Sequence, residues 1–126
     1  MNFFLLLLLL VLSSGAAASA QAEDAIASCN QLEDRQRQIR GCTEYIRSGK
    51  ALGQNLAVAY TNRGIAYASR GDHKRALADF EVSWKTDPSY TQALYARGLA
   101  KKRLGDEKAG DADMAQAKKI DPKLGK

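Results

Sequence analysis

The chain has few of the residues from which catalytic and metal sites are usually built. Among its 126 residues it holds one His, two Cys and two Pro. With a single His, no Gly-rich phosphate loop and no metal-ligand spacing, neither a nucleophile–base–acid set nor a zinc site can be assembled. The shortage of Pro and a hydrophobic content of 45% also argue against a disordered chain. We therefore expect a folded protein that is not an enzyme and has no metal, no cofactor and no catalytic residues.

Charged residues are missing from the amino terminus. Residues 1–22 contain no Asp, Glu, Lys or Arg. An apolar run over 3–12 precedes Ala18-Ser19-Ala20, which has the A-x-A form of a cleavage site. The run is too short to cross a bilayer, which needs about 20 apolar residues. We expect residues 1–20 to be a signal peptide that is cleaved after Ala20, and the mature protein to be periplasmic or secreted, without a transmembrane segment.

A second interpretation of this region is a lipoprotein signal. The residues Ile26-Ala27-Ser28-Cys29 resemble a lipobox. However, Glu23 and Asp24 separate this box from the apolar run, whereas a lipobox normally abuts it. Export without lipid at Cys29 is the favoured interpretation.

Export changes how the two cysteines are interpreted. Disulfides persist outside the cytosol, and Cys29 and Cys42 are the only cysteines of the chain. A bond between them would close a loop of about 14 residues and stabilise the fold by roughly 3 kcal/mol. The alternative is a reactive dithiol, which is less favoured because the chain has no C-x-x-C motif.

The positive charge lies in the carboxy-terminal half. Residues 23–56 hold five acidic and five basic residues, whereas 57–126 hold 9 acidic and 14 basic ones. This excess favours an acidic partner or an anionic surface. It is too small to indicate a nucleic-acid-binding protein.

A repeat of 34 residues is the main pattern in the sequence. Aligned without gaps, 57–90 and 91–124 share 12 identical residues. Several are glycine and proline: Gly64/Gly98, Gly71-Asp72/Gly105-Asp106 and Asp87-Pro88/Asp121-Pro122. A fixed offset of this length indicates a repeated supersecondary unit.

The repeat resembles the tetratricopeptide repeat, a helix–turn–helix unit. The middle copy carries the family's packing residues at Tyr60, Gly64, Tyr67, Ala76, Phe80, Ser83 and Pro88, and the last copy at Leu94, Gly98, Gly110, Met114, Ala117 and Pro122. Lys101 departs from the aromatic position, and Arg63 and Arg97 replace the usual Leu. The same offset places a degenerate first copy over 23–56.

The resemblance implies an all-α fold, a right-handed superhelix of three antiparallel hairpins. The small residues Gly64 and Ala76 would let paired helices approach closely, and Asp87-Pro88 would end one helix before the next. Gly71-Asp72 would end one helix and cap its partner. We expect six helices, at about 23–33, 37–48, 55–70, 73–86, 90–104 and 107–120.

Members of this family bind peptides on a concave surface that is lined by the first helix of each hairpin. The corresponding residues here are Thr61, Asn62, Ile65, Ala68, Ser69, Gln92, Tyr95, Leu99, Lys102 and Arg103. Some members grip a carboxylate with Lys, Asn and Arg; only Asn62 matches, because Gln92 and Ala96 stand where cations are needed. We therefore expect a protein or peptide partner in a bacterial cell envelope, and no recognition of chaperone tails.

Two other functions stay open. The protein could be an assembly protein that self-associates through its terminal hairpin, because no further helix follows 107–120 to cover it. It could also bind anions or cell wall through the basic segment 97–103. The alternative for this segment is the last turn of a helix, where cations are favoured in any case.

Overall fold

The computed structural model describes residues 20–126, so residues 1–19, which hold almost all of the expected signal peptide, lie outside the described residues. Residues 20–30 are helical. Five further helices follow: α2 (Arg35–Arg47), α3 (Gly53–Ser69), α4 (His73–Thr86), α5 (Thr91–Arg103) and α6 (Glu107–Ile120). There is no strand in the described part of the chain. The expected all-α class is therefore confirmed.

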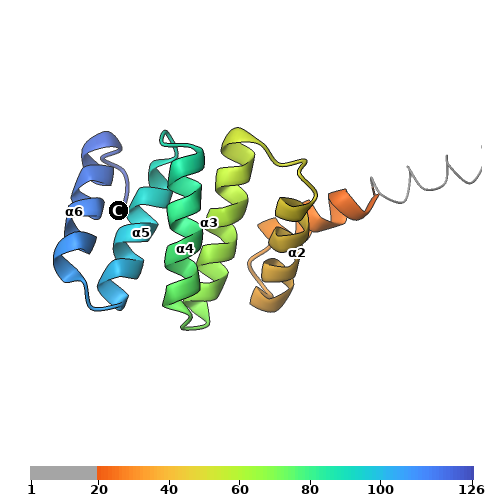
Figure 1. The fold of residues 1–126 in the computed structure, drawn as a ribbon, viewed down its shortest axis with the longest axis horizontal. Helices are drawn as coiled ribbons and strands as arrows, with labels where there is room; N and C mark the ends of the chain where they lie inside the picture. Colours follow the sequence, from red (N-terminus) through yellow and green to blue (C-terminus); the bar gives the residue numbers. More distant parts are fainter. Residues whose placement is uncertain (1–19) are drawn as a thin grey trace, which may run out of the picture.

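The helices stand side by side in the order of the sequence. Figure 1 shows α2 to α6 in a row, with the helix of residues 20–30 beside α2 at one end and α6 at the other. Each helix packs on its neighbours, and α3 also contacts α5 across α4. This is the arrangement of a helical-repeat solenoid, in which every hairpin buries its apolar face against the next one. No helix within 20–126 is both long and apolar enough to cross a membrane.

Acidic residues begin the second helix of every hairpin. The carboxylates of Asp34, Asp72 and Asp106 accept a hydrogen bond from the backbone N–H three residues later, at 3.0, 3.1 and 3.2 Å. Gly71 and Gly105 precede two of these caps with φ of +81° and +95°, which glycine adopts without steric cost. The predicted Gly-Asp turns are therefore present, and α4 and α6 begin where the sequence indicates.

Glycine sets the close approach of the paired helices. A Cβ atom on Gly64 would lie 2.6 Å from the Phe80 ring, and a Cβ on Gly98 would lie 2.7 Å from Met114 Cγ. The same Cβ would lie 2.7 Å from the backbone oxygen of Gly110. Neither Gly64 on α3 nor Gly98 on α5 can carry a side chain without displacing its partner helix.

Two apolar clusters form the core. One consists of Ala76, Phe80 and Ala100, and joins α3, α4 and α5 through partly buried neighbours such as Tyr67. The other joins Cys29 and Cys42 to Ala59 on α3. The core is built mostly from alanine, which permits short distances between helices but buries little apolar area per residue.

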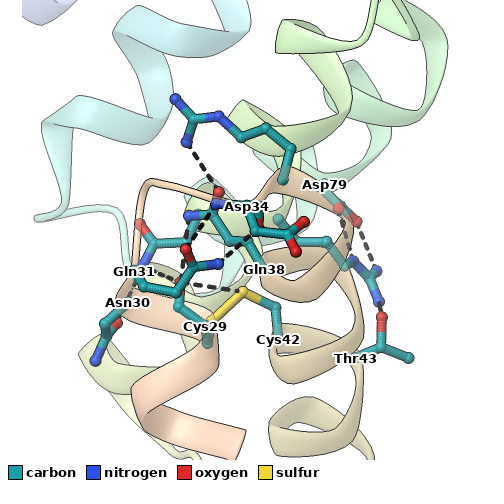
Figure 2. The surroundings of a disulfide bond; sticks show 11 residues. Cys29, Asn30, Gln31, Asp34, Gln38, Cys42, Thr43 and Asp79 are labelled. Atoms are coloured by element: carbon teal, nitrogen blue, oxygen red, sulfur yellow. Dashed lines mark hydrogen bonds and ion pairs between the residues drawn. A yellow bond between two sulfur atoms is a disulfide. The ribbon is translucent and has the colours of Figure 1, made fainter.

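The first hairpin is held by the cysteines. The Sγ atoms of Cys29 and Cys42 lie at disulfide distance, 2.08 Å, and both residues are buried. Buried Gln38 donates from Nε2 to the carbonyl of Cys29 at 3.2 Å (Figure 2). A Cβ on Gly41 would meet the backbone of Cys29 at 2.8 Å, so glycine again permits the close approach.

The first hairpin departs from the expected register. Its first helix ends at residue 30 rather than 33, and α2 begins at Arg35 rather than 37. The turn at 31–34 is fixed by Gln31, whose Oε1 accepts from the backbone N–H of Glu33 and Asp34 at 2.9 Å each. The Asp34 cap thus starts α2 early. The following helix, α3, also begins early: it starts at Gly53, whereas the residue equivalent to the start of α5 at Thr91 is residue 57.

Candidate binding groove

A groove runs between α3 and α5, with α4 behind it. It has a volume of about 260 Å³ and an opening to solvent. Its lining is Ile65, Ala68 and Ser69 from α3, His73 and Phe80 from α4, and Ala96, Leu99, Ala100 and Arg103 from α5. Small-molecule sites usually have about 300–1,000 Å³, so this groove is sized for one or two side chains.

Five residues predicted for the concave face line this groove together. Ile65, Ala68 and Ser69 come from one repeat, and Leu99 and Arg103 from the next. Ile65 and Leu99 hold the same position in the two repeats and are 39% and 44% exposed. Two large apolar side chains therefore stand side by side at the mouth of the groove, and no neighbour among residues 20–126 covers them.

Thr61 does not line the concave face, and this part of the prediction is wrong. Its side chain is only 2% exposed. The Thr61 and Ser83 hydroxyls lie 2.8 Å apart, and Ser83 Oγ donates to the carbonyl of Ala57 at 2.7 Å. Because the close packing of α3 on α4 buries both hydroxyls, they must satisfy each other inside the hairpin.

Asn62 is bound to the first hairpin rather than free to hold a ligand. Its Nδ2 donates to Asn30 Oδ1 at 3.1 Å and to the carbonyl of Cys29 at 3.4 Å. These contacts satisfy the carboxy-terminal end of the helix of residues 20–30. The one residue that matched the carboxylate clamp therefore has a structural partner.

Three other predicted residues lie outside the groove. Gln92 is exposed near the opposite end of α5. The Tyr95 ring lies 5.7 Å from the Lys118 ammonium and touches the chain near Gly125. Lys102 packs on Gly110, and its Nζ is 2.6 Å from Asp111 and 3.6 Å from Glu107, so it faces α6. The repeat position of Lys102 did not reveal this contact with α6, because Glu107 and Asp111 occur only in the last hairpin and are not part of the repeated pattern.

Four residues that line the groove were not among those predicted for the concave face. Ala96 and Ala100 provide the small walls, and Phe80, predicted only as a packing residue, forms the floor. His73 begins α4 at the edge of the groove, and its Nδ1 is buried without a hydrogen-bond partner in the described part of the chain. The sequence could have indicated His73, because it follows the Gly71-Asp72 turn, which places the start of α4 beside the end of α3.

An Arg–Asp pair replaces the usual apolar contact inside each of the two later hairpins. Arg63 Nε and Nη2 donate to Asp79 at 2.8 and 2.7 Å, and Arg97 donates to Asp113 in the same way at 2.8 Å twice. Arg63 Nη1 also reaches Thr43 of α2 at 3.3 Å (Figure 2). The hydrogen bond to Asp79 raises the pKa of Arg63 above its ordinary value although burial opposes this. The arginines that depart from the family pattern are thus explained.

Most of the basic segment 97–103 is paired with carboxylates of α6. Asp113 contacts both Arg97 and Lys101 at 2.8 Å. Burial tends to raise the pKa of Asp113, but hydrogen bonds from these two cations outweigh it and hold the pKa below its ordinary value. Lys102 is paired as described above, whereas Arg103 is exposed and has no ion-pair partner among residues 20–126. The cations of this segment therefore act mainly within the hairpin.

Comparisons with known proteins agree with this geometry. Residues 91–124 match the family model described as tetratricopeptide repeat, which covers 34 of the 126 residues. No curated protein matches the chain in a comparison of sequences. Within 20–126 there is also no group of three or more His, Cys, Asp or Glu residues placed to hold a metal ion. Residues 91–124 thus form a tetratricopeptide repeat, which packs on α3 and α4 as one unit of a helical solenoid.

Proposed function

We propose that the protein is an exported, non-catalytic module that binds another protein through the groove between α3 and α5. Tetratricopeptide repeats suggest a protein–protein interaction module and are generally non-catalytic. The observation that carries the proposal is the pair Ile65 and Leu99, which are 39% and 44% exposed beside the buried Phe80 ring. An apolar side chain of a partner would bury this surface, and each such burial is worth about 1.5–3 kcal/mol.

The first expected result concerns Ile65. Peptides selected from a random phage-displayed library on the wild-type protein should bind the Ile65→Glu variant at least tenfold more weakly, since about 1.4 kcal/mol of apolar burial is lost. Isothermal titration calorimetry with the selected peptides measures this change.

Val82 on α4 offers a matched control. It is 40% exposed, close to the value for Ile65, but it does not line the groove. Val82→Glu should therefore leave the peptide affinity unchanged, and both variants should keep the free energy of unfolding within about 0.5 kcal/mol. Equal losses in the two variants, or none in either, would argue against the groove.

Export supplies the second expected result. The two cysteines are paired in the fold, and such bonds persist in an oxidising compartment. Intact mass spectrometry of the protein from its native host should give the mass of 21–126, which rises by about 2 Da on reduction. A species that begins at Cys29 and carries lipid would contradict soluble export.

The two other functions have less support from the contacts. The exposed surface of α6 carries Lys108, Asp111, Gln116 and Lys119, which suits contact with water more than self-association. Anion binding through 97–103 would have to compete with the carboxylates that already pair with Arg97, Lys101 and Lys102. If analytical ultracentrifugation shows that the molecular mass rises with protein concentration, self-association through the terminal hairpin would be favoured instead.

A further inference from the structure

We propose that the groove binds an extended peptide segment in which an apolar residue is followed, two positions later, by Asp or Glu. This inference rests on the proposed binding function and names the ligand of the same groove. It follows from the distribution of apolar and charged groups along the groove and from its dimensions.

The middle of the groove is apolar. Phe80 lies at the floor and is 3% exposed, with Ala96 and Ala100 beside it and Ile65 and Leu99 at the mouth. No charged side chain interrupts this stretch. It therefore fits one apolar side chain, such as that of Leu, Ile or Met.

The polar end of the groove is basic. Ser69 ends α3, His73 begins α4 and Arg103 ends α5, so these three residues meet at one end of the hairpins. No Asp or Glu lines the groove. A carboxylate placed here would find a guanidinium and no competing acid.

Arg103 is the cation available to a ligand. Arg97, Lys101 and Lys102 each have a carboxylate within 2.8 Å on α6, whereas Arg103 has none among the described residues. His73 Nδ1, which has no hydrogen-bond partner in residues 20–126, lies at the same end. Arg103 is therefore the exposed basic residue that lines the groove and has no acidic partner among residues 20–126.

The spacing follows from helix and strand geometry. Leu99 and Arg103 are one turn apart on α5, which corresponds to about 6 Å along the helix. In an extended peptide, alternate side chains point to the same side and lie roughly 6.6 Å apart. An apolar residue at Leu99 thus places the side chain two positions later beside Arg103.

The opposite end of α5 cannot serve the carboxylate. Gln92 and Ala96 are uncharged, and Asn62 is hydrogen-bonded to Cys29 and Asn30 of the first hairpin. The acidic group is therefore expected at the end of α5 that carries Arg103. Because the spacing between Leu99 and Arg103 matches that of alternate side chains in an extended peptide, we assign the acidic group to a side chain within the peptide rather than to a terminal carboxylate.

The test uses acetylated and amidated peptides of Gly and Ser that contain Leu-Ser-Glu, Leu-Ser-Gln or Leu-Ser-Lys. Binding is followed by ¹H–¹⁵N NMR titration. The wild-type protein should bind the Glu peptide at least tenfold more tightly than the Lys peptide, and Arg103→Glu should reverse this order. Lys108→Glu makes a comparable charge change at an exposed site on α6 outside the groove and should leave the order unchanged.

The outcomes separate this inference from the proposed function. If the three peptides bind equally and Ile65→Glu abolishes their binding, the acidic preference is wrong and the groove function stands. If library-selected peptides are also insensitive to Ile65→Glu, the groove function itself fails. If the Gln peptide gains affinity only when its carboxy terminus is left free, a terminal carboxylate is the ligand and the internal pattern is overturned.

Discussion

Replacing Asp79 with Ala is expected to lower the free energy of unfolding by about 3–5 kcal/mol. The Asp79 side chain is 7% exposed and accepts two hydrogen bonds from Arg63, whose side chain is 19% exposed. Without Asp79 a guanidinium would stay between α3 and α4, and within residues 20–126 Thr43 would be its one remaining hydrogen-bond partner. Such a loss is a large part of the 5–15 kcal/mol that stabilises an ordinary domain. Urea unfolding followed by circular dichroism measures it.

Two further variants distinguish the buried pair from general disruption. Arg63→Leu/Asp79→Leu replaces the pair with apolar residues and restores the leucine that is usual at the arginine position, so it should lose much less than Asp79→Ala. Asp24→Ala breaks the exposed pair with Arg37, in which both side chains are more than half exposed, and should cost under about 0.5 kcal/mol. A double variant as unstable as Asp79→Ala would show that the pair itself is not the cause.

Loss of the Cys29–Cys42 bond is expected to cost about 3 kcal/mol. The bond closes a loop with a sequence separation of 13, and its loss frees the unfolded chain of that constraint. The first hairpin should be affected most, because it has the weakest repeat pattern and its helix α2 packs on α3 but not on α4, α5 or α6. Unfolding of the wild-type protein with and without reductant measures the effect without any substitution.

Hydrogen exchange locates the expected loss. In the reduced protein the amides of residues 20–30 and α2 should exchange faster, whereas those of α5 and α6 should keep their protection. The Cys29→Ala/Cys42→Ala variant serves as the control and should match the reduced protein. Uniform loss of protection over all helices would contradict a local role of the bond.

The last two hairpins could be predicted from the sequence because local signals agreed there with the tertiary contacts. The Gly-Asp turns at 71–72 and 105–106 fix the starts of α4 and α6, and the small residues at Gly64 and Gly98 permit the helix approach. In the first hairpin the expected end of the first helix was wrong by three residues and the expected start of α2 by two. The cause is local: Gln31 and Asp34 close an early turn, a contact that no repeat position encodes.

The groove was only partly predictable for a similar reason. Ile65 and Leu99, which the repeat period places at equivalent positions, both line the groove. Repeat positions do not reveal that Thr61 is buried against Ser83, or that Lys102 faces Asp111, because these contacts depend on which side chain the partner helix presents.

The sequence shows the arginine and the aspartate of each Arg–Asp pair as identical residues of the two repeats, but the sequence analysis did not predict that they contact each other. Both copies contain an identical arginine and an identical aspartate 16 residues later. In a helical hairpin, residues 16 positions apart can face each other from the two paired helices. The shared arginine and aspartate therefore indicated this contact. A pair of unusual residues shared by two repeats indicates mutual contact more strongly than either residue alone.

An NMR titration with a library-selected peptide tests most directly whether the groove between α3 and α5 is the binding surface. The largest ¹H–¹⁵N shifts should fall on Ile65, Ala68, Leu99 and Arg103, and they should vanish in Ile65→Glu but persist in Val82→Glu. Shifts that cluster instead on the outer face of α6, or that survive in Ile65→Glu, would contradict binding in this groove.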